Sequence, residues 1–291
     1  MTQSTSPAHL TAGTLHLGPV ELSVSDLNRS VPFYRTLLGL TVLEQTQSSV
    51  TLGLPGQPLL NLNEQRGALP SRPTSPGLYH FAVLLPTRAD LSRWAQHAAR
   101  LGLRLGQSDH LVSEAFYLND PDGHGIEVYR DRPAHEWKWR DGQVQMAGDP
   151  IDLNNLLAEP GADAPYTTLP AGTVMGHVHL RVTDLARTET FYRDVLGFDI
   201  VSRWPGALFV SVSGYHHHLG LNVWQSQNGS PAPQEIAQLR RVNLHLPRRS
   251  DLHALAARLQ TANVTFTLHG NSLDVRDPAG NTLHFQAGED A

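Results

Sequence analysis

Two stretches of the chain begin with the same alternation of apolar and other residues and then change to a helical spacing. Within residues 18–43 and 176–201, apolar residues first recur at every second position, which is the period of a half-buried β-strand. An aspartate follows each strand pattern, Asp26 in one stretch and Asp184 in the other, where its side chain can cap a helix. The apolar positions then follow a helical spacing until a glycine ends the run, Gly39 in the first stretch. Each stretch therefore predicts a strand followed by a helix.

These two stretches are copies of one repeat. They align without a gap, and 12 of the 26 positions are identical. A second, weaker repeat relates residues 80–91 to 241–252, and a helical pattern follows each copy, at 91–101 and 252–259. Each helical pattern leads to an Asp-Pro-x-Gly turn, in which proline fixes one backbone angle and glycine accepts a positive φ, and then to a strand. The chain therefore holds four similar units, at 14–65, 77–130, 174–225 and 239–287.

The repeat predicts an α+β fold built from four βαβββ modules. We expect two domains with curved mixed sheets, residues 14–130 from units one and two and residues 174–287 from units three and four. Between them, residues 131–173 form a linker rich in proline, glycine and aspartate, with one short helix expected at 151–157. A βαβββ unit leaves one face of its sheet uncovered, so two units together can curve into a cleft that buries a small ligand.

Composition narrows the class of protein. The 291 residues are 40% hydrophobic and 17% charged, as in an ordinary globular chain, and they suffice for two domains. A formal net charge of -5 argues against nucleic-acid binding, because no basic stripe is available to neutralise phosphates. The absence of cysteine excludes disulfides, thiolate catalysis and cysteine-based zinc sites, and it suits a reducing cytosol. We find no secretory signal and no apolar run long enough for a bilayer, so a cytoplasmic protein is expected.

Comparison of the four units separates repeated residues from residues that differ between copies. Units two and three carry histidine and glutamate at positions on their predicted strands where units one and four carry other residues. The pairs, with the residue of unit two or three first, are His177 and Pro19, His80 and Arg241, Glu127 and His284, and the run His216–His218 against Gln57–Leu59.

Two histidines and one carboxylate on rigid strands are the ligand set of the facial triad that holds iron(II) and leaves coordination positions open. His80, Glu127 and His177 therefore predict a metal site. Taken singly, each has a simpler interpretation, since a lone strand histidine is usually a satisfied core residue and a glutamate after a turn is usually solvated. We place His216–His218 on the last strand of unit three, where side chains alternate, so that His216 and His218 point away from a cleft that His217 faces.

The motifs resemble a known family. The openings GPVELSVSDL and GHVHLRVTDL, each followed by FYR and a glycine, are similar to the glyoxalase/bleomycin resistance/extradiol dioxygenase group, the vicinal oxygen chelate superfamily. The segments GLYHFAVLLP, DPDGHGIEVY and GYHHHLGLN more closely resemble the two-domain Bacillus-type catechol 2,3-dioxygenases. The resemblance spans about residues 16–287 and implies a ring-cleaving enzyme that inserts both atoms of O2 into a catechol or a substituted catechol or hydroquinone.

The resemblance also implies a role for individual residues. It assigns His80, Glu127 and His177 as ligands of Fe(II), and Mn(II) fits the same ligands. It further implies that three residues act on the substrate or on oxygen: His217, Tyr117 and His110. The expected partners are a small aromatic diol and O2, not nucleic acid or membrane, and an uncovered sheet edge leaves room for a homo-oligomer.

The proposed ligands come from different halves of the chain, so units two and three must face each other across one cleft. A competing arrangement gathers His177 or His179 with His217, His245 and His284 into an all-histidine site of the C-terminal half. Two other functions remain open at this point. One is a metal-dependent isomerase or lyase of the glyoxalase kind, which needs no oxygen, and the other is a metal-free protein that sequesters a drug or another small molecule.

Overall fold

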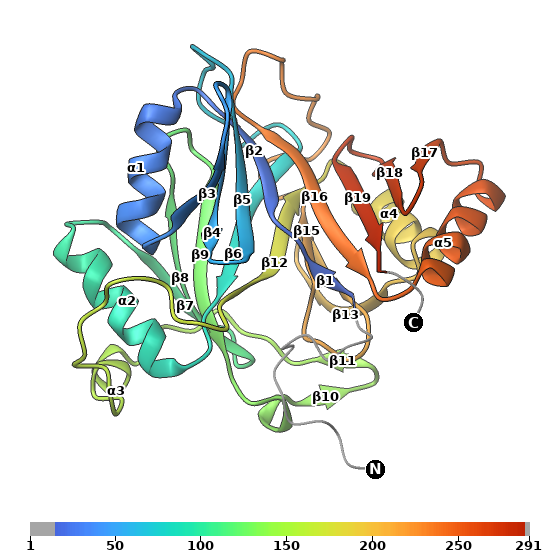
Figure 1. Cartoon of the computed structure of the whole chain (residues 1–291). Helices are drawn as coiled ribbons and strands as arrows, with labels where there is room; N and C mark the ends of the chain where they lie inside the picture. Colours follow the sequence, from blue (N-terminus) through green and yellow to red (C-terminus); the bar gives the residue numbers. More distant parts are fainter. Residues whose placement is uncertain (1–14, 289–291) are drawn as a thin grey trace.

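The computed structural model describes residues 15–288. Two large curved sheets stand at the centre of the molecule, with α1 (Leu27–Leu38) and α2 (Arg88–Arg100) on one flank. The other flank carries α4 (Leu185–Glu189) and α5 (Arg249–Thr261) (Figure 1). This is the α+β fold with curved mixed sheets that the repeat predicts.

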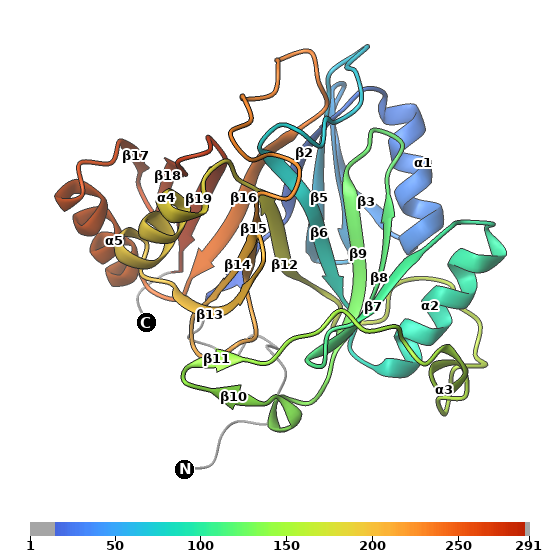
Figure 2. The same ribbon diagram turned by 180° about the vertical axis from the view of Figure 1, so that it is seen from behind.

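The first sheet joins unit two to unit three. Its eight strands run in the order β13-β14-β15-β12-β6-β9-β8-β7, and the first strands of the two units, β6 and β12, pair antiparallel at its centre (Figure 2). The strands are β6 (Gly77–Leu84), β7 (Gly106–Asp109), β8 (Ser113–Asn119), β9 (Gly125–Asp131), β12 (Val174–Arg181), β13 (Asp199–Trp204), β14 (Ala207–Ser211) and β15 (Leu219–Asn222).

The second sheet joins unit one to unit four in the same way. Its main path is β17-β18-β19-β16-β2-β5-β4-β3, with β2 and β16 antiparallel at the centre, and the short strand β1 (His16–Leu17) pairs with β16. Each half of the sequence therefore contributes one unit to each sheet. The other strands are β2 (Val20–Val24), β3 (Thr41–Gln45), β4 (Ser49–Leu54), β5 (Gln57–Glu64), β16 (Leu239–Leu246), β17 (Phe266–His269), β18 (Ser272–Arg276) and β19 (Thr282–Ala287).

Helix boundaries follow local chemistry. Asp26 and Asp184 cap α1 and α4, as predicted, and Gly39 ends α1 in the left-handed conformation. The second and fourth helices begin three residues earlier than predicted. For α2 the cause is Thr87, whose side chain accepts from the backbone N–H of Asp90 while the Asp90 carboxylate accepts from the N–H of Thr87. This capping box stabilises a polar first turn that the apolar spacing does not show.

The helix of the opening repeat is tied to the turn of the following unit in both halves of the chain. The Tyr34 hydroxyl donates to Oδ2 of Asp120 at 2.9 Å, and the Tyr192 hydroxyl donates to Oδ2 of Asp277 at 3.1 Å. Both aspartates begin the Asp-Pro-x-Gly turns, in which the glycines adopt positive φ as expected. The tyrosine of the repeated FYR motif therefore joins neighbouring units and does not reach the cleft.

The linker does more than connect the halves of the chain. It contains a 3₁₀ turn (Ala134–Glu136), the hairpin β10 (Trp139–Arg140) and β11 (Gln143–Val144), and the short helix α3 (Leu153–Leu157), which begins after its cap Asp152. Asp149 exchanges backbone hydrogen bonds with Asp109. The linker therefore lies against β7, at the border of the cavity described below. No helix between residues 15 and 288 combines the length and apolar character that crossing a bilayer requires.

Candidate metal centre

Three neighbouring strands bring the predicted ligands together. β12 pairs antiparallel with β6, β6 pairs parallel with β9, and Ala82 of β6 stands opposite both His177 and Glu127. His80 lies two residues before Ala82 and therefore on the same face of the strand. The small Ala82 side chain leaves the space between His177 and Glu127 open. The structure thus provides the pairing of units two and three that this ligand set requires.

The three side chains converge on one point. Nε2 of His80 is 2.9 Å and Nε2 of His177 is 3.2 Å from Oε2 of Glu127, and one ligand atom from each residue lies within 4.8 Å of the others. All three residues are buried. Within residues 15–288, this is the group of histidine and carboxylate side chains that has the geometry of a metal site.

The residues present fit a divalent cation. Two donor atoms about 2.1 Å from one ion and at right angles to each other are about 3 Å apart, as these atoms are. Oε1 of Glu127 is buried without a hydrogen-bond partner, and Nε2 of His80 makes no hydrogen bond although it lies close to Oε2 of Glu127; a bound cation would satisfy both atoms. Burial alone would raise the pKa of Glu127, but His177 and His80 lower it well below its usual range, whereas burial lowers the pKa of His177. An ionised carboxylate and a neutral imidazole are the forms that bind metal.

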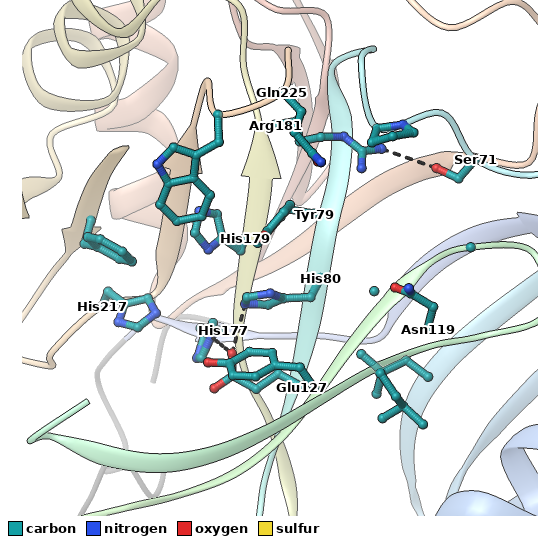
Figure 3. A pocket seen from close by; sticks show the side chains of 18 of the residues that line it. Ser71, Tyr79, His80, Asn119, Glu127, His177, His179, Arg181, His217 and Gln225 are labelled. Carbon is teal, nitrogen blue, oxygen red and sulfur yellow. Dashed lines mark hydrogen bonds and ion pairs between the residues drawn. The ribbon is translucent and has the colours of Figure 1, made fainter. Parts of the chain in front are cut away.

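The cluster lies in the wall of a cavity of about 600 Å³. Figure 3 shows Glu127, His177 and His80 close together, with His217 beside them and Arg181 away from them. Four aromatic residues line much of the remaining wall, a composition that suits a flat organic ligand. They are Tyr79, Trp204, Phe209 and Trp224.

Tyr117 and His110 form a hydrogen-bonded pair in this wall. Tyr117 stands directly opposite Glu127 on β8, and its hydroxyl lies 2.6 Å from Nε2 of His110. Nδ1 of His110 is 2.6 Å from the carbonyl oxygen of Ala147, to which it must donate. In a neutral imidazole, Nε2 then carries the lone pair and accepts from the Tyr117 hydroxyl. Burial, followed by the charge of Glu127, raises the pKa of Tyr117 well above its usual range, so the phenol remains protonated.

His217 also lines the cavity, with its ring 4.2 Å from the ring of His177 between centroids. The prediction that His216–His218 belong to a strand is wrong. Ser213 and Gly214 adopt positive φ and form a turn, and β15 begins only at Leu219. Strand alternation therefore does not apply, and the side chains of His216 and His217 meet.

A buried hydrogen-bonded chain leads away from His217. Nδ1 of His217 lies 2.8 Å from Nδ1 of His216, and Nε2 of His216 lies 2.7 Å from Oδ1 of Asp131. The Tyr215 hydroxyl donates to the other oxygen of Asp131 at 3.0 Å. Burial, followed by the neighbouring histidines, lowers the pKa of His217 well below its usual range. Sequence reasoning missed His216 and Asp131 as site residues, although the His216–His218 run was a visible signal.

The all-histidine alternative does not form. His245 and His284 belong to β16 and β19 of the second sheet. His245 stacks on His16 with 4.9 Å between ring centroids, and Nδ1 of His284 lies 2.8 Å from Oδ1 of Asp274. His179 lies in the cavity wall, but its Nε2 is hydrogen-bonded to Nδ2 of Asn222 at 3.0 Å.

The βαβββ units and the cleft between two of them define a class of protein. Residues 16–128 and 174–285 match the family model of the Glyoxalase/Bleomycin resistance protein/Dioxygenase superfamily, and the chain belongs to this superfamily. The resemblance that the motifs indicated is therefore confirmed.

Particular relatives add detail. The chain is 42% identical over 269 residues to the catechol-2,3-dioxygenase of Bacillus subtilis (strain 168), covering 90% of this chain and 94% of that enzyme. It is also 29% identical over 114 residues to the glutathione transferase FosA of Serratia marcescens, covering 39% of this chain and 79% of that one. Among solved structures, a putative dioxygenase from Bacillus subtilis aligns with a TM-score of 0.64 at 11% identity, over 95% of this chain and 86% of that chain. At such low identity this last likeness shows the fold alone.

Proposed function

We propose that this protein is a non-haem iron(II)-dependent extradiol dioxygenase. It would cleave the ring of a catechol, or of a substituted catechol or hydroquinone, and insert both atoms of O2. The observation that carries the proposal is the buried cluster of His80, Glu127 and His177 in the wall of an aromatic-lined cavity. The 42% identity to a catechol-2,3-dioxygenase over nearly the whole chain supports it.

His80, Glu127 and His177 would hold the metal ion. Iron(II) there would supply one-electron chemistry and open coordination positions, at which a diol and O2 can be brought together. The protein contributes one negative charge through Glu127, so the cluster with iron(II) keeps a net positive charge that favours an ionised diol. The buried setting excludes water and strengthens these electrostatic interactions.

Tyr117 and His110 would receive the substrate. Because the Tyr117 hydroxyl directs its proton to His110, its oxygen lone pairs are free to accept from a substrate hydroxyl. A proton leaving the substrate can then be accommodated by this pair, with the Tyr117 proton moving to Nε2 of His110. Such positioned proton acceptors typically contribute about 10²–10⁴-fold to a rate.

His217 would handle the second proton of the reaction. Asp131 accepts from Nε2 of His216, so Nδ1 of a neutral His216 accepts from Nδ1 of His217. This leaves the lone pair of His217 on Nε2, the one ring nitrogen that the hydrogen-bonded chain does not use. A proton taken up at Nε2 can be matched by transfer of the Nδ1 proton to His216, where Asp131 stabilises the positive charge.

The test is oxygen uptake by protein loaded with iron(II) under anaerobic conditions. With catechol we expect equal consumption of O2 and diol and a yellow ring-opened product. An enzyme of the glyoxalase kind would instead turn over without oxygen, and a sequestering protein would bind ligand without metal. Among residues 15–288, Glu127 is the one carboxylate that lines the cavity, which disfavours a site built on two carboxylates. Metal analysis of the active protein would decide between iron and manganese.

A further inference from the structure

A second charged group lies in the cavity wall and has no role in the mechanism above. Arg181, the last residue of β12, is only 6% exposed. Its Nε donates to the carbonyl oxygen of Ser75 at 2.9 Å, and its Nη2 donates to Oγ of Ser71 at 3.3 Å. No aspartate or glutamate of the described chain forms an ion pair with it. Burial lowers the pKa of Arg181 to about 10, with Tyr79 as the only compensating group, so the guanidinium remains charged at neutral pH.

Arg181 shares one face of β12 with the candidate metal centre. His177, His179 and Arg181 occupy alternate positions of the strand, and all three line the cavity. At about 3.3 Å per residue, the Cα atoms of His177 and Arg181 are roughly 13 Å apart. Figure 3 draws Arg181 with Ser71, away from the carboxylate of Glu127. The cavity therefore has a carboxylate and histidines in one part and a guanidinium in another.

The fold does not require an arginine at this position. In the opening repeat, Arg181 aligns with Ser23 of unit one, the last residue but one of β2. Ser23 ties its strand to the adjacent loop through uncharged hydrogen bonds with the backbone of Gln238. A small hydroxyl thus makes the structural connection in one copy of the unit. A buried charge without a carboxylate partner costs free energy, so the guanidinium of Arg181 calls for another explanation.

We propose that Arg181 binds a carboxylate on the substituent of the aromatic diol, so that the preferred substrate is a catechol bearing an acidic side chain. This rests on the proposed function for the position of the diol, near Glu127 and Tyr117. The planar guanidinium is suited to carboxylate oxygens and has donors that Ser71 and Ser75 do not use. Tyr79 and Trp224, which also line the cavity, offer apolar surface to the ring and its substituent.

The first test compares an acid with its own ester, because the two differ only in charge and one small group. Iron-loaded protein is assayed with 3,4-dihydroxyphenylacetate and with its methyl ester. We expect kcat/KM to favour the acid by roughly 10- to 100-fold, the worth of one charge-assisted hydrogen bond. In Arg181→Met the acid-to-ester ratio should fall to near one, and in Arg181→Lys it should fall partway. Arg240→Met removes an exposed arginine outside the cavity and should retain the wild-type ratio.

The acid-to-ester ratio of kcat/KM is measured within one variant, so a general loss of activity affects both substrates equally and leaves the ratio unchanged. If the wild-type protein cleaves acid and ester equally well, or if Arg181→Met keeps the preference for the acid, the assignment is overturned. If Arg181→Met folds poorly, the proposal can still be refuted, because the acid-to-ester ratio of the wild-type protein tests it without the variant.

A second readout does not depend on turnover. Calorimetry on metal-free protein compares phenylacetate with phenylacetamide, and we expect the acid to bind at least about 10-fold tighter, with the difference lost in Arg181→Met. If no diol is cleaved but this difference is present, the anion site stands and the proposed function fails. If diols are cleaved and the acid has no advantage in either experiment, the function stands and the anion site is refuted.

Discussion

The two sheets have the same strand order and pairing, but the polar side chains at corresponding positions make different contacts in the two sheets. In the second sheet, Arg241 forms a 2.5 Å ion pair with Glu21, and His284 is hydrogen-bonded to Asp274. In the first sheet, His80 and Glu127 occupy the places of Arg241 and His284, and each retains a buried atom without a hydrogen-bond partner. At these two places the second sheet has paired side chains, whereas the first has buried atoms that lack a hydrogen-bond partner and are of the kind that bind an ion.

The comparison extends to the next strand. Asp274 stands ten residues before His284 and opposite it in the sheet, as Tyr117 stands ten residues before Glu127 and opposite it. One sheet thus has a carboxylate hydrogen-bonded to a histidine, and the other has a phenol facing a carboxylate. The backbone supplies the same pair of positions twice, and the side chains at these positions differ between the two sheets. Each residue of the first sheet therefore has a natural control in the second.

The largest effect is expected for Glu127→Ala. Loss of the only carboxylate in the cluster should lower metal affinity by more than the roughly 10- to 100-fold typical of residues that merely support a ligand. Metal content after iron loading and desalting measures this, and diol-dependent oxygen uptake should fall with it. His284→Ala is the matched control and should bind wild-type amounts of iron. Equal iron content in Glu127→Ala and the wild-type protein would show that the ligand assignment is wrong.

Tyr117→Phe should reduce turnover and leave the metal in place. The change removes a hydroxyl of the cavity wall that contacts Nε2 of His110 but keeps the ring, so we expect kcat to fall by about 10²–10³-fold. Asp274→Asn, at the corresponding place in the second sheet, should keep wild-type kcat. The assignment fails if Tyr117→Phe loses iron, or if its kcat equals that of the Asp274 variant.

His216→Gln should have a smaller effect, because His216 acts through His217. The amide oxygen of glutamine can still accept from Nδ1 of His217, but the amide cannot take up the proton as an imidazole can. We expect kcat to fall by about 10- to 100-fold while KM for the diol changes little. His218→Gln is the control, since Nδ1 of His218 is hydrogen-bonded to Ser211 and takes no part in the chain. Nitrogen NMR of the metal-free wild-type protein should show neutral His217 protonated at Nδ1, and a His217 protonated at Nε2, or a wild-type kcat in His216→Gln, would refute the relay.

The differences between the two sheets also explain what could be predicted. Strand periodicity and the gapless repeat predict four βαβββ units, because both depend on local patterns. The positions of His80, Glu127 and His177 are visible for the same reason, since each stands at a repeated place where its copy differs. For these three side chains to meet, units two and three must share a sheet. The repeat does not predict that pairing; it is inferred only from the requirement that the three ligands meet.

Contacts between segments without a repeat could not be predicted. The turn at Ser213 and Gly214 replaces strand alternation, so the side chains of His216 and His217 meet against expectation. Asp131 enters the site because β9 continues past Glu127 to the loop that carries His216, and no pattern in the sequence joins them. Arg181 lies in a strand whose sequence has no unusual feature. It is distinguished only by its position in the cavity wall and by the lack of a carboxylate partner among the described residues.

The smallest effects are expected where the two halves of the chain are alike, at Tyr34 and Tyr192. Tyr34→Phe should cost about 1–3 kcal/mol, because Oδ2 of the buried Asp120 accepts from no other donor among residues 15–288. Tyr192→Phe should cost less, about 0.5–1.5 kcal/mol, since Oδ2 of Asp277 also accepts from Nδ2 of Asn281 at 2.9 Å. Urea unfolding of the two variants measures the difference, and both should bind iron like the wild-type protein. If Tyr192→Phe were the less stable variant, a missing donor at the turn could not explain the stability of this junction. If either variant lost iron, the repeated tyrosine would contribute to the metal centre. Residues repeated in both halves of the chain could then not be regarded as purely structural.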